Sequence, residues 1–452
     1  MTAMTSMLKS ANHTLLTAPL LLIGAVGLVS AMQPTPASEP ATNAVMEADF
    51  KMKPGDHKKV GEKMGQCIEA YLARDGRRDT EEELRSYIEK KWAKAAGKDR
   101  EALALSDDLA AALWYAKDYS KTKGVRKGKI EDLSVPVTYN GEYVAKNAIW
   151  IPKKYDPKKV KYPLIFCIPD ADEKPEAHLN DHWALAGMRD NALLVALDMP
   201  EGTDHWGGLG EKNNADQAGG YAILLTTFGI LSEGYAIDYD KIFIAGRGAG
   251  VAAAMQIAEK SPDRFAGIIG RTGDAAEMGP TNLSNMACYF AGAGPNATAY
   301  AEAAKEAEYA ESTVNPAGNT EDIWTWIGGV SRMSNPETVR VVPGKPSTKA
   351  YWIEAGRKEY ADGDSLVASI NRAANTITIE SIGVESVTLF FNDTLVDMDK
   401  KVKVIINGAV HEDEIPRNFY SMMEQIYRGR SDSGKLYTAF KAYDVPSTES
   451  SN

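Results

Sequence analysis

One stretch of this sequence decides the fold, and it reads Asp238-Tyr239-Asp240-Lys241-Ile242-Phe243-Ile244-Ala245-Gly246-Arg247-Gly248-Ala249-Gly250-Val251-Ala252-Ala253-Ala254. Its apolar run Ile242–Ala245 is typical of a strand that is buried on both faces. Three alternating glycines, Gly246, Gly248 and Gly250, then predict a sharp turn, because glycine adopts backbone angles that other residues avoid. The alanine-rich segment Val251–Glu259 predicts a closely packed helix. We therefore expect a strand, a tight turn and a helix in direct succession.

Apolar runs alternate with helical patterns on both sides of this stretch. The predicted strands are Val135–Tyr139, Tyr143–Ile151, Tyr162–Ile168, Leu193–Leu197, Phe265–Ile269 and Ala287–Ala291. The predicted helices are His182–Met188, Ala218–Ser232, Ala297–Glu311 and Asp322–Val330. Such alternation predicts an α/β fold, with a mostly parallel sheet and helices on both faces. Asn140-Gly141 predicts a hairpin turn between the first two strands.

Beyond Ser334 the helical patterns nearly stop. The strands expected there are Thr338–Val342, Ala350–Glu354, Leu366–Ile370, Thr376–Glu380, Val387–Phe391 and Val402–Ile406. Their regular spacing favours a C-terminal β-sandwich. Asn407-Gly408 predicts a hairpin turn before a further strand, Ala409–Glu412, and Pro416–Tyr427 predicts one closing helix.

The N-terminus has the layout of a secretory signal peptide. Lys9 and His13 precede the apolar run Leu15–Val29, and small residues follow up to Ala31, after which we expect cleavage. The run is short for a membrane span. We therefore predict a secreted, periplasmic or cell-envelope protein with no integral membrane span after signal cleavage.

The expected domain organisation has six parts. These are a signal peptide at 1–31, a linker rich in Pro, Ala, Ser and Thr at 32–47, a helical module at 48–123, an α/β domain at 124–334, a β-sandwich with its closing helix at 335–445, and a tail at 446–452.

Composition excludes several classes of function. The 452 residues carry a formal net charge of −11, which argues against nucleic acid as a partner. The three cysteines, Cys67, Cys167 and Cys288, are too far apart to indicate a disulfide framework or a cysteine zinc site. We expect no cofactor.

Three segments carry a resemblance to a known superfamily. They are Tyr162-Pro163-Leu164-Ile165-Phe166, Gly234-Tyr235-Ala236-Ile237-Asp238-Tyr239-Asp240-Lys241-Ile242-Phe243-Ile244-Ala245-Gly246 and Ser261-Pro262-Asp263-Arg264-Phe265-Ala266-Gly267. Together they resemble secreted bacterial esterases of the α/β-hydrolase superfamily, in particular the polyhydroxybutyrate-depolymerase and feruloyl-esterase-like group and prolyl-oligopeptidase-type hydrolase domains. The resemblance covers Val135–Val330. It implies that the glycine turn is a nucleophile elbow, whose motif is G-x-S-x-G.

The catalytic set that the resemblance implies is degenerate. Gly248 stands at the nucleophile position and has no side chain that could attack a substrate. Where the superfamily has a His-Gly pair that shapes the oxyanion hole, this chain has Ile168-Pro169-Asp170-Ala171-Asp172. Pro169 lacks an N–H group, and the two carboxylates would repel a developing oxyanion. The place of the triad acid is Gly292-Ala293-Gly294-Pro295-Asn296, without a carboxylate.

The triad histidine is also missing from its implied place, the segment Asn315-Pro316-Ala317-Gly318-Asn319-Thr320. The one histidine beyond the elbow, His411, belongs to the β-rich tail. We therefore predict a hydrolase that has lost activity and serves as a binding or scaffolding protein, with no catalytic residue and a degenerate elbow at Gly246, Gly248 and Gly250. The alternative is an active secreted carboxylic-ester hydrolase or serine-peptidase-like enzyme with a displaced catalytic set, because triads are defined by geometry.

Polar residues concentrate near two predicted strand ends, where ligand crevices form in such sheets. They are Asp170, Asp172, His178, Asp181, His182, Asp198, Glu201, Asp204 and His205. The candidate crevice residues among them are Asp170, Asp172, His178, His182, Asp204 and His205, for a small-molecule, sugar or peptide ligand. His178 and His182 would share one helix face, which leaves a metal-assisted hydrolase as a further hypothesis. No glutamate completes an H-E-x-x-H pattern, so we name no metal ligand.

Overall fold

The computed structural model describes residues 50–73, 86, 90, 102–122, 124–185, 187–199, 206–318, 320–344, 348–356, 359–430 and 432–446. The predicted signal peptide and linker, residues 1–47, lie outside the described residues, as does the part of the helical module at 74–101 apart from residues 86 and 90. None of the described helices is long and apolar enough to cross a membrane.

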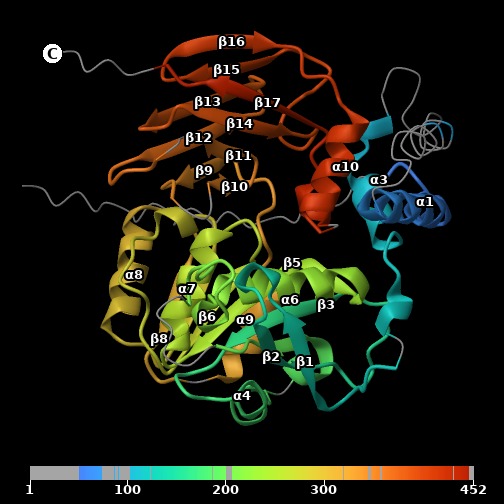
Figure 1. The fold of residues 1–452 in the computed structure, drawn as a ribbon. Helices are drawn as coiled ribbons and strands as arrows, with labels where there is room; N and C mark the ends of the chain where they lie inside the picture. Colours follow the sequence, from blue (N-terminus) through green and yellow to red (C-terminus); the bar gives the residue numbers. More distant parts are fainter. Residues whose placement is uncertain are drawn as a thin grey trace, which may run out of the picture. The chain divides into compact units, whose positions relative to one another are not determined.

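The main sheet has eight strands in the order β1-β2-β4-β3-β5-β6-β7-β8 (Figure 1). The strands are β1 (Ile130–Pro136), β2 (Val144–Trp150), β3 (Tyr162–Ile168), β4 (Leu193–Ala196), β5 (Ile237–Arg247), β6 (Gly267–Arg271), β7 (Ala287–Ala291) and β8 (Ser312–Asn315). β2 pairs antiparallel with β1 and β4, and all pairings from β4 to β8 are parallel. The predicted mostly parallel sheet is confirmed.

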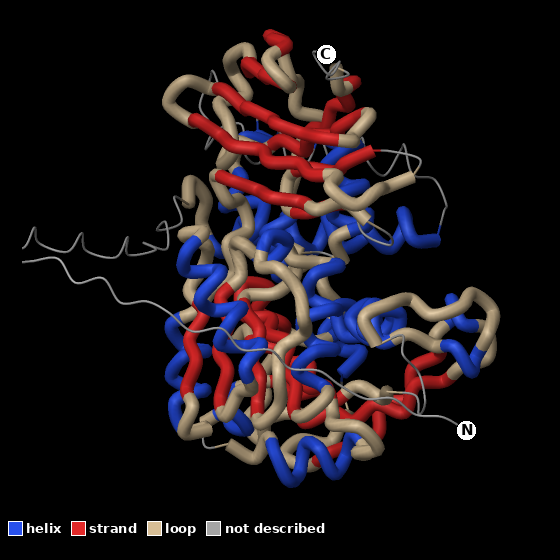
Figure 2. Tube along the Cα trace, turned by 90° about the vertical axis from the view of Figure 1, so that its left-hand side faces the viewer, coloured by secondary structure: helices blue, strands red, loops and turns tan. Residues whose placement is uncertain are grey.

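Helices cover both faces of this sheet (Figure 2). They are α4 (Pro175–His182), α5 (Met188–Asn191), α6 (Gly220–Gly234), α7 (Gly250–Lys260), α8 (Pro295–Glu306) and α9 (Glu321–Gly329). Alternate residues of β5 enter two different cores, as the pleat requires. Ile242 and Ile244 pack with α6, α7 and α8, whereas Phe243 and Ala245 pack with α4, α5 and α9. The prediction that Ile242–Ala245 is buried on both faces is confirmed.

Two predictions within this domain need correction. The predicted helix His182–Met188 is wrong, because α4 starts at Pro175, a residue suited to a first helical turn, and ends at His182. Trp183 then enters the core instead of continuing the helix. Asn140 does not form a two-residue hairpin turn. It is buried, and its side-chain amide donates to the carbonyls of Leu209, Glu211 and Gln217.

The C-terminal strands form two sheets around one core. The strands are β9 (Thr338–Val341), β10 (Lys349–Ala350), β11 (Ile353–Gly356), β12 (Ser365–Asn371), β13 (Thr376–Ile382), β14 (Ser386–Phe391), β15 (Val402–Ile406), β16 (Ala409–Asp413) and β17 (Ala439–Asp444). One sheet has the order β10-β11-β14-β17 and the other β16-β15-β13-β12-β9. Leu366 and Val404 of one sheet share a core with Val387 and Leu389 of the other. The predicted β-sandwich is confirmed.

A third core joins helices from both ends of the chain. α1 (Pro54–Ala73) and α3 (Ser106–Trp114) pack with α10 (Phe419–Arg428), the closing helix predicted at Pro416–Tyr427. Short 3₁₀ helices complete the described elements: η1 (Ala102–Ala104), η2 (Tyr119–Thr122), η3 (Thr138–Asn140), η4 (Ala215–Gln217), η5 (Thr281–Leu283) and η6 (Ser433–Lys435).

A buried ion network ties the α/β core to the C-terminal segment. Both Nη atoms of Arg332 donate to the carboxylate of Asp432 at 2.6 Å, and both side chains are almost fully buried. Arg332 Nη1 also donates to the Asp263 carbonyl, and Lys435 pairs with the Asp263 carboxylate at 2.7 Å. Each buried charge therefore has an opposite charge in contact, as burial of ionic groups requires.

Candidate functional site at the glycine elbow

The turn after β5 has the conformation of a nucleophile elbow. Gly248 follows the last residue of β5 with a φ of 55°, and α7 begins two residues later at Gly250. A Cβ atom on Gly246 would lie 2.0 Å from the Gly250 carbonyl oxygen, and one on Gly250 would lie 2.4 Å from that of Ile168. The first and last glycines are therefore required by close backbone contacts, and the middle one by its left-handed conformation.

The side chain of Asp170 fills the space in front of Gly248. A Cβ atom built on Gly248 would lie 2.1 Å from the carboxyl carbon and from both carboxylate oxygens of Asp170. Contacts this short do not occur between non-bonded atoms. The carboxylate of Asp170 thus occupies the volume in which a nucleophilic side chain at position 248 would stand.

Asp170 also occupies the hydrogen-bond donors of the elbow. Its Oδ1 accepts from the backbone N–H groups of Ala249 and Ala171, each at 2.9 Å, and its Oδ2 accepts from Nη1 of Arg247 at 3.4 Å. In an active enzyme of this fold, the N–H after the nucleophile and an N–H from the loop after β3 form the oxyanion hole. Here the Asp170 N–H donates to Glu173, and Pro169 has none. Pro169 therefore has no N–H to offer, and the N–H groups of Asp170 and Ala171 already donate to Glu173 and to the Asp170 carboxylate.

Glu173 organises the loop that carries Asp170. Its Oε2 accepts from the Asp170 N–H at 3.2 Å and from Nδ1 of His178 at 2.7 Å, and its Oε1 lies 2.9 Å from Nε2 of His182. Nη1 of Arg247 lies 3.8 Å from Oε2. Partial burial is the largest single influence and acts to raise the pKa of Glu173, but His178, the Asp170 N–H and His182 together hold that pKa below its usual value.

His178 is a neutral, fully buried imidazole. Its Nε2 accepts from Nε1–H of Trp183 at 2.8 Å, which leaves the proton on Nδ1 to be donated to Glu173. Burial lowers the pKa of His178 to about 4, although the neighbouring Glu173 carboxylate acts in the opposite direction. His178 therefore serves as a fixed donor that holds Glu173, rather than as a proton carrier at neutral pH.

The structure brings together only some of the sequence-predicted crevice residues. Asp170, His178 and His182 meet around Glu173, whereas Asp172 is exposed on the same loop. Asp198 accepts from the Tyr143 hydroxyl and the Lys146 N–H, so it is bound to the segment around β2. Asp181 is exposed at the end of α4. Glu201, Asp204 and His205 lie outside the described residues, so their place near the ligand crevice stays a prediction.

The described part of the chain contains no group of three His, Cys, Asp or Glu side chains placed to hold a metal ion. The two histidines of the metal-assisted hypothesis instead contact one carboxylate, that of Glu173. The sequence analysis did not identify Glu173, which lies in the loop two residues before the start of α4.

The described residues at the implied places of the triad acid and histidine include neither a carboxylate nor an imidazole. Asp274, which the sequence analysis did not identify, lies beside Gly294. Its carboxylate accepts hydrogen bonds from the N–H groups of Ala275, Asn296 and Ala297, and it therefore caps the N-terminus of α8. His411 lies on β16, with its ring centroid 5.4 Å from that of Tyr443 in the β-sandwich.

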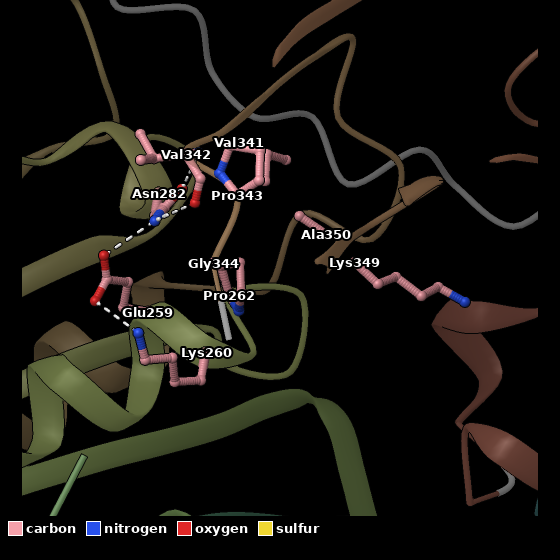
Figure 3. A pocket seen from close by; sticks show the side chains of 10 residues that line it. All are labelled: Glu259, Lys260, Pro262, Asn282, Val341, Val342, Pro343, Gly344, Lys349 and Ala350. Carbon is pink, nitrogen blue, oxygen red and sulfur yellow. Dashed lines mark hydrogen bonds and ion pairs between the residues drawn. The ribbon is translucent and has the colours of Figure 1, made fainter. Parts of the chain in front are cut away.

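A cavity of about 220 Å³ lies away from the elbow, at the C-terminal end of α7 (Figure 3). Its lining includes Glu259, Asn282 and Val342. The Asn282 amide donates to Glu259, and its Oδ1 accepts from the Val342 N–H, which closes one wall. Glu259 also pairs with Lys260 at 3.6 Å, whereas the Lys349 side chain extends away from the other labelled residues in the figure.

The strand order, the antiparallel second strand and the glycine turn after β5 are those of the α/β-hydrolase fold. No family model and no curated protein matches the chain. A thermostable esterase is similar in structure, with 17% identity, a TM-score of 0.35, and coverage of 45% of this chain and 64% of that one. The S-formylglutathione hydrolase of Agrobacterium tumefaciens has 11% identity and a TM-score of 0.35, over 44% of this chain and 94% of that one. A ferulic acid esterase of Anaeromyces mucronatus has 13% identity and a TM-score of 0.33, over 45% and 90%.

Proposed function

We propose that this protein is a non-catalytic member of the α/β-hydrolase fold that works by binding or scaffolding. The observation that carries the proposal is the position of the Asp170 carboxylate, which fills the nucleophile volume beside Gly248 and accepts both backbone donors of the elbow. Ester and amide hydrolysis needs those donors for the negative charge that develops in the transition state. A resident negative charge in the same place opposes that development.

A second reading, hydrolysis by a displaced catalytic set, has one observation in its favour. Asp170 is itself a carboxylate at the nucleophile position, and carboxylates form covalent intermediates in some enzymes. Such a nucleophile also needs a base that delivers water to the intermediate. The two imidazoles near Asp170 contact Glu173 instead, and His178 is further held by Trp183. The donors that hold Asp170 would also lower its reactivity as a nucleophile.

Two assays on the purified wild-type protein separate these readings. We expect no turnover of p-nitrophenyl acetate above the rate with a heat-unfolded sample, and no labelling by a fluorophosphonate probe. A known serine esterase assayed alongside serves as the positive control. Turnover that co-purifies with the protein, and that Asp170→Asn abolishes, would establish the displaced-set enzyme and refute the non-catalytic proposal.

Export is part of the proposal. It is supported by the charged start, the apolar run Leu15–Val29 and the small residues before Ala31. Expression of the full chain in a bacterium with a Sec pathway, followed by N-terminal sequencing, tests it. A mature protein that begins at Met32 in the periplasm or the medium is the expected result, and full-length protein in the cytoplasm would contradict it. The ligand class stays open between a small molecule, a sugar and a peptide.

A further inference from the structure

Three donors from two segments of the chain converge on one place at the elbow. They are the N–H of Ala171 in the loop after β3, the N–H of Ala249 in the turn after β5, and the guanidinium of Arg247 at the end of β5. All three meet the same group, the Asp170 carboxylate. Hydrogen bonds that place backbone N–H groups and a guanidinium on one carboxylate are of the strong, charge-assisted kind.

We propose that the elbow is a carboxylate-binding site that Asp170 keeps occupied, and that a carboxylate of an external ligand takes the Asp170 position when the side chain leaves. Asp170 is then an internal ligand and an autoinhibitory contact. The inference rests on the proposed non-catalytic function, because a hydrolase would present a nucleophile in the same volume.

The group that now occupies the site is itself a carboxylate. It lies so close to Gly248 that a Cβ atom there would be 2.1 Å from all three atoms of the Asp170 carboxyl group. We therefore expect a planar carboxylate to fit in its place, and phosphate, with four oxygens around a central atom, serves as the comparison.

Two of the three donors, those of Arg247 and Ala249, are held by contacts that do not involve Asp170. Arg247 also contacts Glu173, which His178 and His182 hold from the other side. The Ala249 N–H belongs to the start of α7, so its direction is set by the helix. The Asp170 side chain is 36% exposed, and it can rotate toward solvent without opening a core. The site is therefore preorganised, which keeps the cost of ligand binding low.

Asp170→Ala with sodium formate is the direct test, because formate restores the missing carboxylate. We expect formate to raise the thermal midpoint of the variant and to bind it with a Kd on the order of 10 mM, whereas wild type shows no response because a tethered carboxylate outcompetes a free one. Sodium chloride at equal ionic strength controls for screening. Adding Arg247→Met to the variant should weaken formate binding about tenfold, because one charged donor is lost.

Asp274→Ala provides a matched control. Asp274 Oδ1 also accepts two backbone N–H groups, those of Ala275 and Ala297, but no ion pair joins it to a described Lys or Arg. We expect no formate response from this variant. A response equal to that of Asp170→Ala would contradict a specific site at the elbow, and so would a folded Asp170→Ala protein that formate stabilises no more than chloride does.

Two further measurements test which class of anion binds and keep the test valid if Asp170→Ala does not fold by itself. Inorganic phosphate that binds Asp170→Ala as tightly as formate would overturn the carboxylate assignment. If Asp170→Ala is unfolded in chloride, folded protein in formate supports the site, and unfolded protein in both salts contradicts it. These readouts are independent of ester turnover by wild type, so a failure of this inference is distinguishable from a failure of the proposed function.

Discussion

Gly248→Ser would give the turn the G-x-S-x-G motif of active enzymes, and we expect a destabilised protein without hydrolase activity. The new Cβ atom would lie 2.1 Å from the Asp170 carboxylate, so Asp170 must leave its donors. The two N–H bonds lost are worth about 1.5 kcal/mol each, at the lower end of the range for charged groups because Asp170 is partly exposed. A serine at the φ of 55° adds about 1 kcal/mol of backbone strain.

The free energy of unfolding should therefore fall by about 4 kcal/mol, measured by urea denaturation followed by circular dichroism. Asp170→Ala removes the same carboxylate, so the two changes are not independent. In the double variant the two N–H bonds are lost only once, so we expect the combined loss to be smaller than the sum of the single losses by about 3 kcal/mol.

Two results would refute this reasoning. A Gly248→Ser protein within about 0.5 kcal/mol of wild type would show that Asp170 does not fill the elbow. Strictly additive losses in the double-variant cycle would show that residues 170 and 248 do not compete for one volume. Ester turnover by Gly248→Ser alone would in addition contradict the proposal that this protein lacks a catalytic base and that Asp170 blocks the donors.

Three further predictions concern other parts of the structure. Burial lowers the pKa of His178 from 6.5 to about 4, so the unfolded chain binds a proton more readily than the folded protein between these pH values. The free energy of unfolding should therefore fall by up to about 3 kcal/mol as the pH drops through this range. In His178→Gln the free energy of unfolding should depend less steeply on pH. Arg332→Met should lower the free energy of unfolding, measured by urea denaturation, by about 3–5 kcal/mol, because it removes the ion-pair partner of the buried Asp432 carboxylate. Asp432→Asn in the same protein should recover part of that loss. Asn140→Ala should lower the free energy of unfolding by about 2 kcal/mol, since its amide donates to three carbonyls; an unchanged denaturation midpoint would contradict that role.

The local pattern of apolar and polar residues was sufficient to predict most of the strands and helices. Tyr162–Ile168, Ala287–Ala291 and Val402–Ile406 are strands with the predicted bounds, because an uninterrupted or alternating apolar run has one low-energy arrangement in a layered protein. The short strands β8 and β17 were not predicted. β8 follows directly on a helical pattern, and its residues are only half-buried, so no apolar run marks it.

The candidate site was predicted only in outline. The glycine spacing and the Asp-rich loop placed Gly248 and Asp170 near the same sheet edge, and the superfamily resemblance marked the missing nucleophile. The role of Glu173 between two histidines and Arg247 was not visible, and neither was the capping role of Asp274. These roles depend on which donors each carboxylate meets, and the donors come from other segments.

The sequence by itself determined the succession of strands and helices, the conformation of the elbow and the absence of a nucleophile there, because each depends on residues close together in the chain. Only the tertiary structure decided what occupies the empty place. Asp170 and Ala249 are 79 residues apart, and they meet because β3 and β5 are neighbours in a parallel sheet. The partly exposed carboxylate of Asp170 thereby becomes a ligand of the elbow, because β3 and β5 end at the same edge of the sheet and the loops that follow them bring the Ala171 and Ala249 N–H groups to it.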